Sequence, residues 1–531
     1  MTRRSPPRSK PLRALGNAAV LATTLLAPRS AQSAGSAAPS AAEIVAAARD
    51  SLGWDDLART GAGVRIRGAA RFLGTDAEQM LLFDGAGRYL ETFKGGPLRQ
   101  SDGFDGKTAW ERDWTDTPRV LVLGDRASAE LSALFLTGGW TVAGPLLEFE
   151  SLTQASENEI ALAFAHADGV LSGTVVLDAT TKRARSLSFG ADETPSAWTF
   201  EDYRDHDGFV FPARITFTQG GMTQGFEPSS VERLAEVDGA AFTPRIEPPG
   251  GTRFDADSAP ELEVKRARTG HLLVHPTVDG EDLGWFIFDS GAGVNCIAND
   301  VTEALPEGPF GEIGARGVGG DVPARFWRAK ELRLGPITVA DPVFMGLDLA
   351  FLEPHFGVPV GGILGYEFLA RCVAELDMVA GSIAIHDPAA YALPEGGRWE
   401  DVQLYGRHPC VRASFEDREG VFKIDTGAAN DTVTLHYRVV QDLDLTSGRE
   451  TTMAMAGGVG GQVGTRIGKL ASFRLGGHDF SAITAGFALE DKGAFADDYV
   501  WGNIGGKLLE PFRLVFDYPG GRLGFVPRAG R

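Results

Sequence analysis

Two stretches of this chain share one pattern: Phe286–Ala292 reads FIFDSGA, and Val421–Ala428 reads VFKIDTGA. In each stretch, apolar residues typical of a β-strand lead into an aspartate, which Ser or Thr, Gly and Ala then follow. A shorter strand and a turn precede each stretch, so we expect each aspartate to end the second strand of a hairpin. The two aspartates, Asp289 and Asp425, are 136 residues apart.

Three further landmarks recur downstream of each aspartate, in the same order. The offset between the copies is 141 residues for the first landmark and 140 for the other two. One Asp-Ser/Thr-Gly motif is most often only a turn. Four matched landmarks instead indicate that residues 263–387 and 403–528 are copies of one unit. The three landmarks are GVGG at 317–320 and 458–461, GILG at 362–365 with GNIG at 502–505, and Leu376-Asp377 with Phe516-Asp517.

The residue types of the two motifs suit a shared acid site. The Ser and Thr hydroxyls and the loop N–H groups can stabilise a carboxylate that would be costly to bury alone, and the glycines permit a close approach. If the two aspartates meet, both cannot ionise, so one keeps a proton. Such a pair can hold a water, with one carboxylate taking its proton and the other carboxyl donating to the carbonyl under attack. This chemistry needs no metal or cofactor.

With these motifs, residues 263–528 resemble the aspartic proteases, specifically the retropepsin-like and pepsin-like enzymes of bacteria. The resemblance implies a mainly β, bilobal pair of β-barrels in which Asp289 and Asp425 are the catalytic dyad. It implies that the residues after each aspartate support the dyad, and that both GVGG runs are flaps over a peptide substrate. Two motifs in one chain are similar to the pepsin arrangement, so we expect a monomer rather than an obligate dimer. The implied support residues are Ser290, Gly291, Thr426 and Gly427, and the implied flap residues are Gly317, Val318, Gly319, Gly458, Val459 and Gly460.

Three features depart from the pattern of that family. Neither flap run has the aromatic residue that pepsin-like enzymes carry there. Lys423 stands two positions before Asp425, on the same face of its strand, where an apolar residue is usual. Asn503 replaces an apolar residue in the last Gly-rich landmark. An alternative function follows: a weak or inactive protease fold that binds peptides or lipoproteins in the periplasm.

The region before the repeats, residues 40–243, has a different pattern of predicted helices and strands. A capping-box pattern at 40–43 predicts a helix that ends near Gly53. Short alternating runs separated by Asp-Gly pairs follow, interrupted by one helical patch at 127–136. We therefore expect an antiparallel β domain with one or two helices. It weakly resembles the lipoprotein-carrier fold, through Gly103-Phe104-Asp105-Gly106, Trp110, Asp202-Tyr203-Arg204 and Phe211-Pro212.

The remaining boundaries follow from composition. A Pro- and Gly-rich segment at 244–262 predicts a linker, and a weaker break near 390 divides the first lobe, 263–390, from the second, 391–531.

Residues 1–36 have a basic flank, a short apolar stretch and small residues, the layout of a secretory signal peptide. Because that apolar stretch is too short to span a bilayer, we expect no transmembrane anchor in the mature chain and a periplasmic or secreted location.

Charge and cysteine content exclude several other functions. The chain has 531 residues, with 51 Lys and Arg against 71 Asp and Glu, a net charge of −20. Nucleic acid is not an expected partner, because phosphate binding depends on clustered basic residues. The nine His and the three Cys (Cys296, Cys372 and Cys410) lack metal-ligand spacing, so no metal site is predicted. Whether any two of these Cys form a disulfide is left open.

Overall fold

The computed structural model describes residues 39–190, 195–219 and 222–528, with only the backbone described at 150–155. The predicted signal peptide, residues 1–36, lies outside the described residues. No helix within the described part is long and apolar enough to cross a membrane. The α-helices are α1 (Ala41–Leu52), α2 (Trp54–Thr60), α3 (Leu123–Thr137), α4 (Glu353–Phe356), α5 (Tyr366–Leu369), α6 (Tyr437–Asp442) and α7 (Gly506–Leu509). The 3₁₀ helices are η1 (Gly139–Val142), η2 (Gly144–Leu146), η3 (Gly239–Phe242), η4 (Asn299–Ala304), η5 (Ala350–Leu352) and η6 (Gly493–Phe495).

The N-terminal region is one antiparallel sheet of thirteen strands, in the order β6-β5-β4-β3-β2-β1-β13-β12-β11-β10-β9-β8-β7. Strands consecutive in sequence pair with each other except β6 and β7, which lie at opposite edges of the sheet with α3 between them in the chain. β1 also pairs with β13, which joins the first and last strands of the region. Its strands are β1 (Gly63–Phe72), β2 (Thr75–Asp84), β3 (Tyr89–Gly95), β4 (Leu98–Phe104), β5 (Ala109–Arg112), β6 (Pro118–Val120), β7 (Leu147–Ser156), β8 (Glu159–His166), β9 (Ser172–Asp178), β10 (Ala184–Phe189), β11 (Ser196–His206), β12 (Phe209–Gln219) and β13 (Met222–Leu234).

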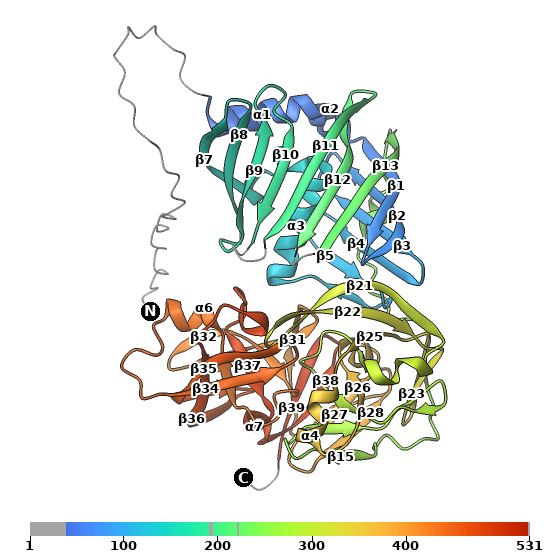
Figure 1. Cartoon of the computed structure of the whole chain (residues 1–531), viewed down its shortest axis with the longest axis vertical. Coiled ribbons are helices and arrows are strands. Elements are labelled where there is room, and N and C mark those ends of the chain that lie inside the picture. Colours follow the sequence, from blue (N-terminus) through green and yellow to red (C-terminus); the bar gives the residue numbers. More distant parts are fainter. Residues whose placement is uncertain (1–38, 191–194, 220–221, 529–531) are drawn as a thin grey trace. The chain divides into compact units, whose positions relative to one another are not determined.

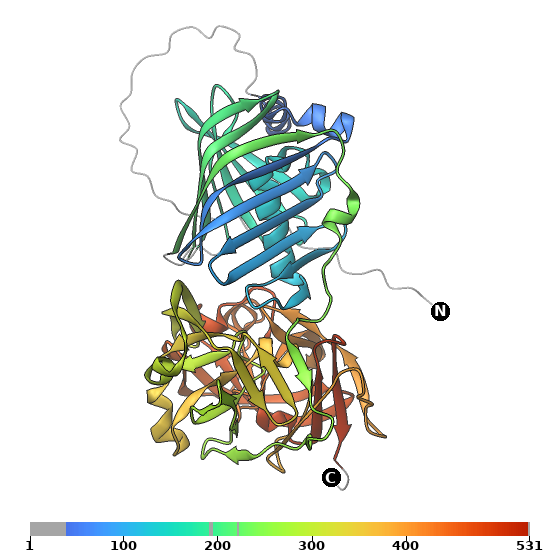
Figure 2. The ribbon, with the colours of Figure 1, turned by 90° about the vertical axis from the view of Figure 1, so that its right-hand side faces the viewer.

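Helices α1 and α3 form where the sequence predicts them. The Ser40 hydroxyl accepts the N–H of Glu43, and the Glu43 carboxylate accepts the N–H of Ser40, so the capping box that starts α1 is complete. Gly53 ends the helix in a left-handed conformation. The sheet curves around α3 (Figure 2), and Leu131 of that helix lies in one buried cluster with Phe164 of the sheet.

The C-terminal region, coloured from yellow-green to red in Figure 1, contains the predicted duplication. It forms two eight-stranded sheets with the same pairing order. The first sheet runs β15-β16-β19-β26-β20-β25-β22-β21, and the second runs β30-β31-β32-β37-β33-β36-β35-β34. The first sheet consists of β15 (Val264–Arg266), β16 (Leu272–Val274), β19 (Trp285–Phe288), β20 (Cys296–Ala298), β21 (Glu307–Gly317), β22 (Gly320–Arg328), β25 (Val343–Leu347) and β26 (Val360–Leu364). The second consists of β30 (Gln403–Tyr405), β31 (His408–Phe415), β32 (Arg418–Asp425), β33 (Val433–Leu435), β34 (Thr452–Gly458), β35 (Gly461–Leu475), β36 (His478–Ala488) and β37 (Gly502–Gly505).

Two five-stranded sheets complete this region. One, in the order β28-β27-β38-β39-β29, joins the two copies, because β27 pairs antiparallel with β38 and sets Leu376 opposite Leu514. The other includes β14, a strand from the segment expected to be a linker, which pairs with β24 of the first copy. The strands are β27 (Val373–Asp377), β28 (Ser382–His386), β29 (Arg398–Asp401), β38 (Phe512–Asp517) and β39 (Arg522–Pro527) in the first of these sheets, and β14 (Thr252–Phe254), β17 (Thr277–Val278), β18 (Glu281–Asp282), β23 (Glu331–Leu334) and β24 (Ile337–Ala340) in the second.

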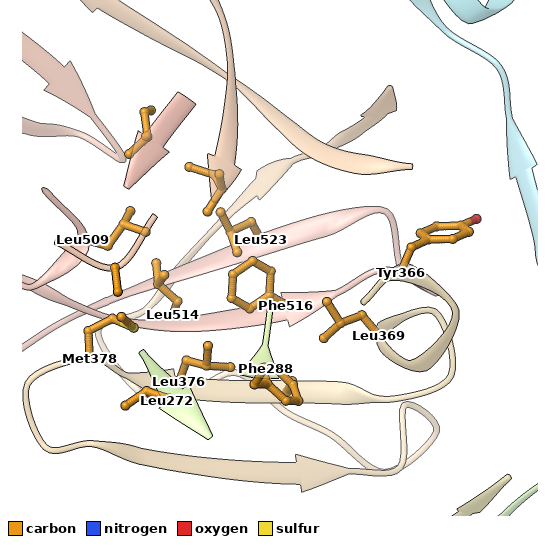
Figure 3. Packing of buried hydrophobic residues seen from close by; sticks show 14 of the residues in the cluster. Leu272, Phe288, Tyr366, Leu369, Leu376, Met378, Leu509, Leu514, Phe516 and Leu523 are labelled. Atoms are coloured by element: carbon orange, nitrogen blue, oxygen red, sulfur yellow. The ribbon is translucent and has the colours of Figure 1, made fainter. Parts of the chain in front are cut away.

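One large core stabilises the junction of the two copies. Phe288 of the first copy lies in the same buried cluster as Leu514 and Phe516 of the second (Figure 3). Each fully buried side chain of this kind contributes about 1.5–3 kcal/mol to stability. The expected fold class, a mainly β bilobal unit preceded by an antiparallel β domain with helices, is confirmed.

Candidate active site

Each predicted aspartate lies at the end of a strand that its own Gly-rich landmark supports. Asp425 is the last residue of β32, which pairs in parallel with β37. Asp289 directly follows β19, which pairs in parallel with β26, and its N–H donates to the Leu364 carbonyl at 3.0 Å. The strand that precedes the aspartate motif was expected to form a hairpin with the motif strand in both copies, and the two copies differ in this. Strand β32 forms a hairpin with β31, whereas a separate small hairpin, β17–β18, comes between β16 and β19.

The Ser and Thr that follow the aspartates bond the two loops to each other. The Ser290 N–H donates to the Thr426 hydroxyl at 2.9 Å, and the Thr426 N–H donates to the Ser290 hydroxyl at 3.1 Å. Each hydroxyl then donates across the junction, Ser290 to the Ile424 carbonyl at 2.9 Å and Thr426 to the Phe288 carbonyl at 3.2 Å. Both side chains are buried, so the four bonds are shielded from competing water.

This arrangement brings the two carboxyl groups together. Oδ1 of Asp289 accepts the N–H of Gly291 at 2.7 Å and, from the other copy, the N–H of Gly427 at 2.9 Å. A Cβ at Gly427 would lie 2.4 Å from Oδ2 of Asp289, and one at Gly291 would lie 2.2 Å from Oδ1 of Asp425. Only glycine therefore lets each carboxyl reach the opposite loop.

Burial raises the pKa of both aspartates above the ordinary value for Asp. The neighbouring charge of Asp289 raises the pKa of Asp425 further, while N–H donors act in the opposite direction on each. Two buried carboxyls whose charges interact titrate as a pair, so the pair retains one proton where exposed aspartates have lost theirs.

Asn503 bonds directly to this pair, a contact that the sequence analysis did not predict. Its side-chain amide donates to Oδ2 of Asp425 at 3.0 Å, which lowers the pKa of that carboxyl. The Nε2 atom of His436 lies 2.9 Å from Oδ1, the side-chain oxygen of Asn503. Burial lowers the pKa of His436 to about 4, so the ring is neutral and Nε2–H is the donor. The first copy has Ile363 at the matching position.

Lys423 does not contact the aspartate pair. Its ammonium bonds to Asp497 at 2.9 Å, and the two side chains are 14% and 9% exposed. The Lys423 ammonium also lies 5.5 Å from the centre of the Tyr405 ring. The basic residue that departs from the family pattern is therefore neutralised by a buried partner from the segment before β37.

The predicted flap residues form the tips of two hairpins that touch. Gly317 pairs with Gly320 at the β21–β22 turn, and Gly458 pairs with Gly461 at the β34–β35 turn. The Gly319 N–H donates to the Val459 carbonyl at 3.0 Å, so one tip bonds to the other. Val318 packs beside the buried cluster of Val463, Ala488 and Phe495.

Within the described residues, no group of three or more His, Cys, Asp or Glu side chains is arranged to hold a metal ion. The three cysteines are free and buried, so no disulfide joins any two of them.

Comparison with known families agrees with this geometry. Residues 274–368 and 411–496 match the family model described as aspartyl protease. Both lobes match the aspartyl protease family. Each matched segment begins shortly before its aspartate motif and extends beyond its flap hairpin. No curated protein sequence matches the chain.

Three solved structures show what the two regions of this chain are similar to. A retropepsin-like aspartic protease from Rickettsia conorii is 21% identical, covering 25% of this chain and all of its own (TM-score 0.20). The aspartic proteinase from Irpex lacteus is 12% identical, covering 51% of this chain and 97% of its own (TM-score 0.32). A LolA superfamily protein from Nitrosomonas europaea is 13% identical, covering 37% of this chain and 97% of its own (TM-score 0.26), and matches the N-terminal region.

Proposed function

We propose that this protein is an exported aspartic endopeptidase that hydrolyses peptide bonds with a water held by Asp289 and Asp425. The observation that carries the proposal is the hydrogen bond from the Gly427 N–H to Asp289, inside the reciprocal Ser290–Thr426 bonding. It supports a dyad built from both lobes of one chain. Export rests on the sequence of residues 1–36 alone.

The proposed reaction uses the single proton that the pair retains. The ionised carboxylate takes a proton from the water as the water oxygen attacks the peptide carbonyl carbon. The protonated carboxyl gives its proton to the carbonyl oxygen, which yields a neutral tetrahedral diol. Collapse of the diol returns one proton to the pair and delivers one to the leaving nitrogen, so that the C–N bond breaks and the pair again holds one proton. The two flap hairpins would fold over the bound peptide.

The test of this proposal is turnover of a mixed peptide library by the full chain, from pH 3 to pH 8. We expect cleavage at discrete bonds, inhibition by the transition-state analogue pepstatin, and no effect of a metal chelator. A wild-type protein that cleaves nothing at any pH, and that binds library peptides without turnover, would instead support the alternative of a binding protein.

Replacing Asn503 by Ile, the residue at the matching position of the first copy, is expected to shift the pH profile. Without the amide donor, the ionised form of Asp425 loses a hydrogen bond to charge, which is worth about 1.5–3 kcal/mol. In the form of the pair with one proton, the charge lies on Asp289, so the Asn503 bond acts on the second ionisation, that of Asp425. The basic limb of the kcat/KM profile should therefore move upward by about one to two pH units. The matched control is Asn158→Ile, at an exposed turn of the N-terminal region. A basic limb that stays in place in Asn503→Ile would show that this bond does not tune the pair.

A further inference from the structure

The N-terminal sheet lines a cavity of about 420 Å³, a size usual for small-ligand sites. One part of its wall is apolar and aromatic, and another part is acidic. The apolar part includes Phe93, Leu136, Trp198, Phe217 and Phe226.

The acidic part is a row of side chains on adjacent strands. Glu91 of β3 is the direct cross-strand partner of Asp102 on β4, and Asp102 is the partner of Glu111 on β5. Arg119 of β6 continues the row, opposite Glu111. All four side chains line the cavity. Like charges directly opposite one another destabilise a sheet, so the row of three acids is costly to the fold.

Within the described part of the chain, Glu111 is the only one of the three acids that forms an ion pair. Glu111 forms ion pairs with Arg119 at 3.2 Å and with Arg407 at 2.7 Å. Glu91 accepts hydrogen bonds from the neutral side chains of Gln79 and Tyr89. Asp102 accepts one from Gln100 at 2.8 Å. Burial raises the pKa of Glu91 to about 7 and the pKa of Asp102 well above its ordinary value, so an incoming cation would find two acids able to ionise beside it.

Hydrogen-bond donors without acceptors line the same cavity. The Arg119 side chain is 6% exposed, and its Nε–H finds no acceptor among the residues that the structure describes. The same holds for the buried indole N–H of Trp198. A buried donor left without a partner costs about 1–3 kcal/mol. Both donor atoms have almost no accessible surface, so they add to the cost of this wall and are not open to a ligand.

We infer that this cavity binds the free N-terminus of a short apolar peptide. Its ammonium group would bond to Glu91 and Asp102, which line the cavity on adjacent strands. Its apolar side chains would lie against Phe217 and the other rings of the wall. The site is separate from the aspartate pair and does not depend on the chemistry proposed there.

The test compares two probes that differ only in the charge of one end, phenylalanyl-leucinamide and its N-acetyl form, by calorimetry on the full chain at pH 7. We expect the free amine to bind at least tenfold more tightly than the acetylated form. In Asp102→Asn this preference should disappear, while the control Glu201→Gln, an exposed residue paired with Arg214 elsewhere in the sheet, should keep it.

The wild-type pair of probes decides the matter even if Asp102→Asn does not fold. Equal binding of both forms, or displacement of both by laurate, would show that the cavity binds apolar groups without recognising the amine. Either result would overturn the inference. Binding of neither probe at millimolar concentration would overturn it as well.

Discussion

Replacement of Asp289 or Asp425 by Asn is expected to lower kcat/KM for peptide cleavage by about 10³- to 10⁴-fold. Asn keeps the size of Asp and can still accept the loop N–H bonds that hold Asp289 Oδ1. It can neither take a proton from the water nor return one, so the loss is specific to the chemical step. The measurement is the steady-state rate on a peptide that the wild-type enzyme cleaves.

Two controls separate this loss from misfolding. Asp417→Asn alters an exposed aspartate, eight residues before Asp425, and should leave the rate unchanged. The two dyad variants should also unfold no more easily than wild type at pH 7. The reason is that burial raises the folded-state pKa of both carboxyls. Such groups lose stabilising free energy as the pH rises from their unfolded pKa, about 4, through the folded pKa, and a neutral Asn avoids that loss. Wild-type rates in either dyad variant would contradict the proposed mechanism.

Replacement of Arg407 by Met is expected to reduce the free energy of unfolding by about 3–5 kcal/mol, because it leaves the buried Asp113 without its cation and Glu111 with Arg119 alone. The Arg407 guanidinium donates to Glu111 at 2.7 Å, forms an ion pair with Asp113 at 3.2 Å, and lies 4.2 Å from the centre of the Trp114 ring. The Asp113 side chain is 0% exposed. This cluster joins the N-terminal sheet to the protease-like region within one chain.

The destabilisation should depend on pH in a defined direction. Burial raises the pKa of Glu111, but Arg119 and Arg407 outweigh it and hold that pKa at about 2. A carboxyl with a depressed folded-state pKa stabilises the fold above its unfolded pKa, about 4.3, and this stabilisation is lost as the pH falls toward 2. The difference between wild type and Arg407→Met should therefore be largest at pH 7 and shrink below about pH 4.

Urea unfolding of both proteins across that pH range checks this expectation. The matched control is Arg474→Met, which removes an exposed pair with Asp479 and should give no measurable change. If Arg407→Met were as stable as this control at pH 7, the buried cluster would not be a stabilising junction.

The sequence predicts the duplicated fold well because its evidence is local and repeated. Each strand, aspartate and glycine turn is marked twice, and the mainly β fold class is confirmed by the matching sheets around β19 and β32. The helix that starts at Ser40 was predictable for a similar reason, since its capping box lies within four residues.

The contacts that the sequence analysis missed depend on long-range register. Asn503 reaches Asp425 only because β37 lies beside β32, 78 residues away in the chain. His436 carries no spacing signal at all. Arg407 and Glu111 are separated by 296 residues, and nothing local in either sequence marks the other as its partner. The row of Glu91, Asp102 and Glu111 likewise requires the exact pairing of three strands.

The most direct test of the account is a pH titration of the Asp289 and Asp425 carboxyl carbons by NMR, assigned with the two Asn variants. The account predicts two separate steps in wild type, with one proton retained by the pair at a pH where exposed aspartates, with pKa values near 3.9, are ionised. It also predicts that Asp289→Asn lowers the pKa of Asp425, since the neighbouring charge is gone. Two carboxyls that each titrate near 3.9, unaffected by loss of the other, would contradict it.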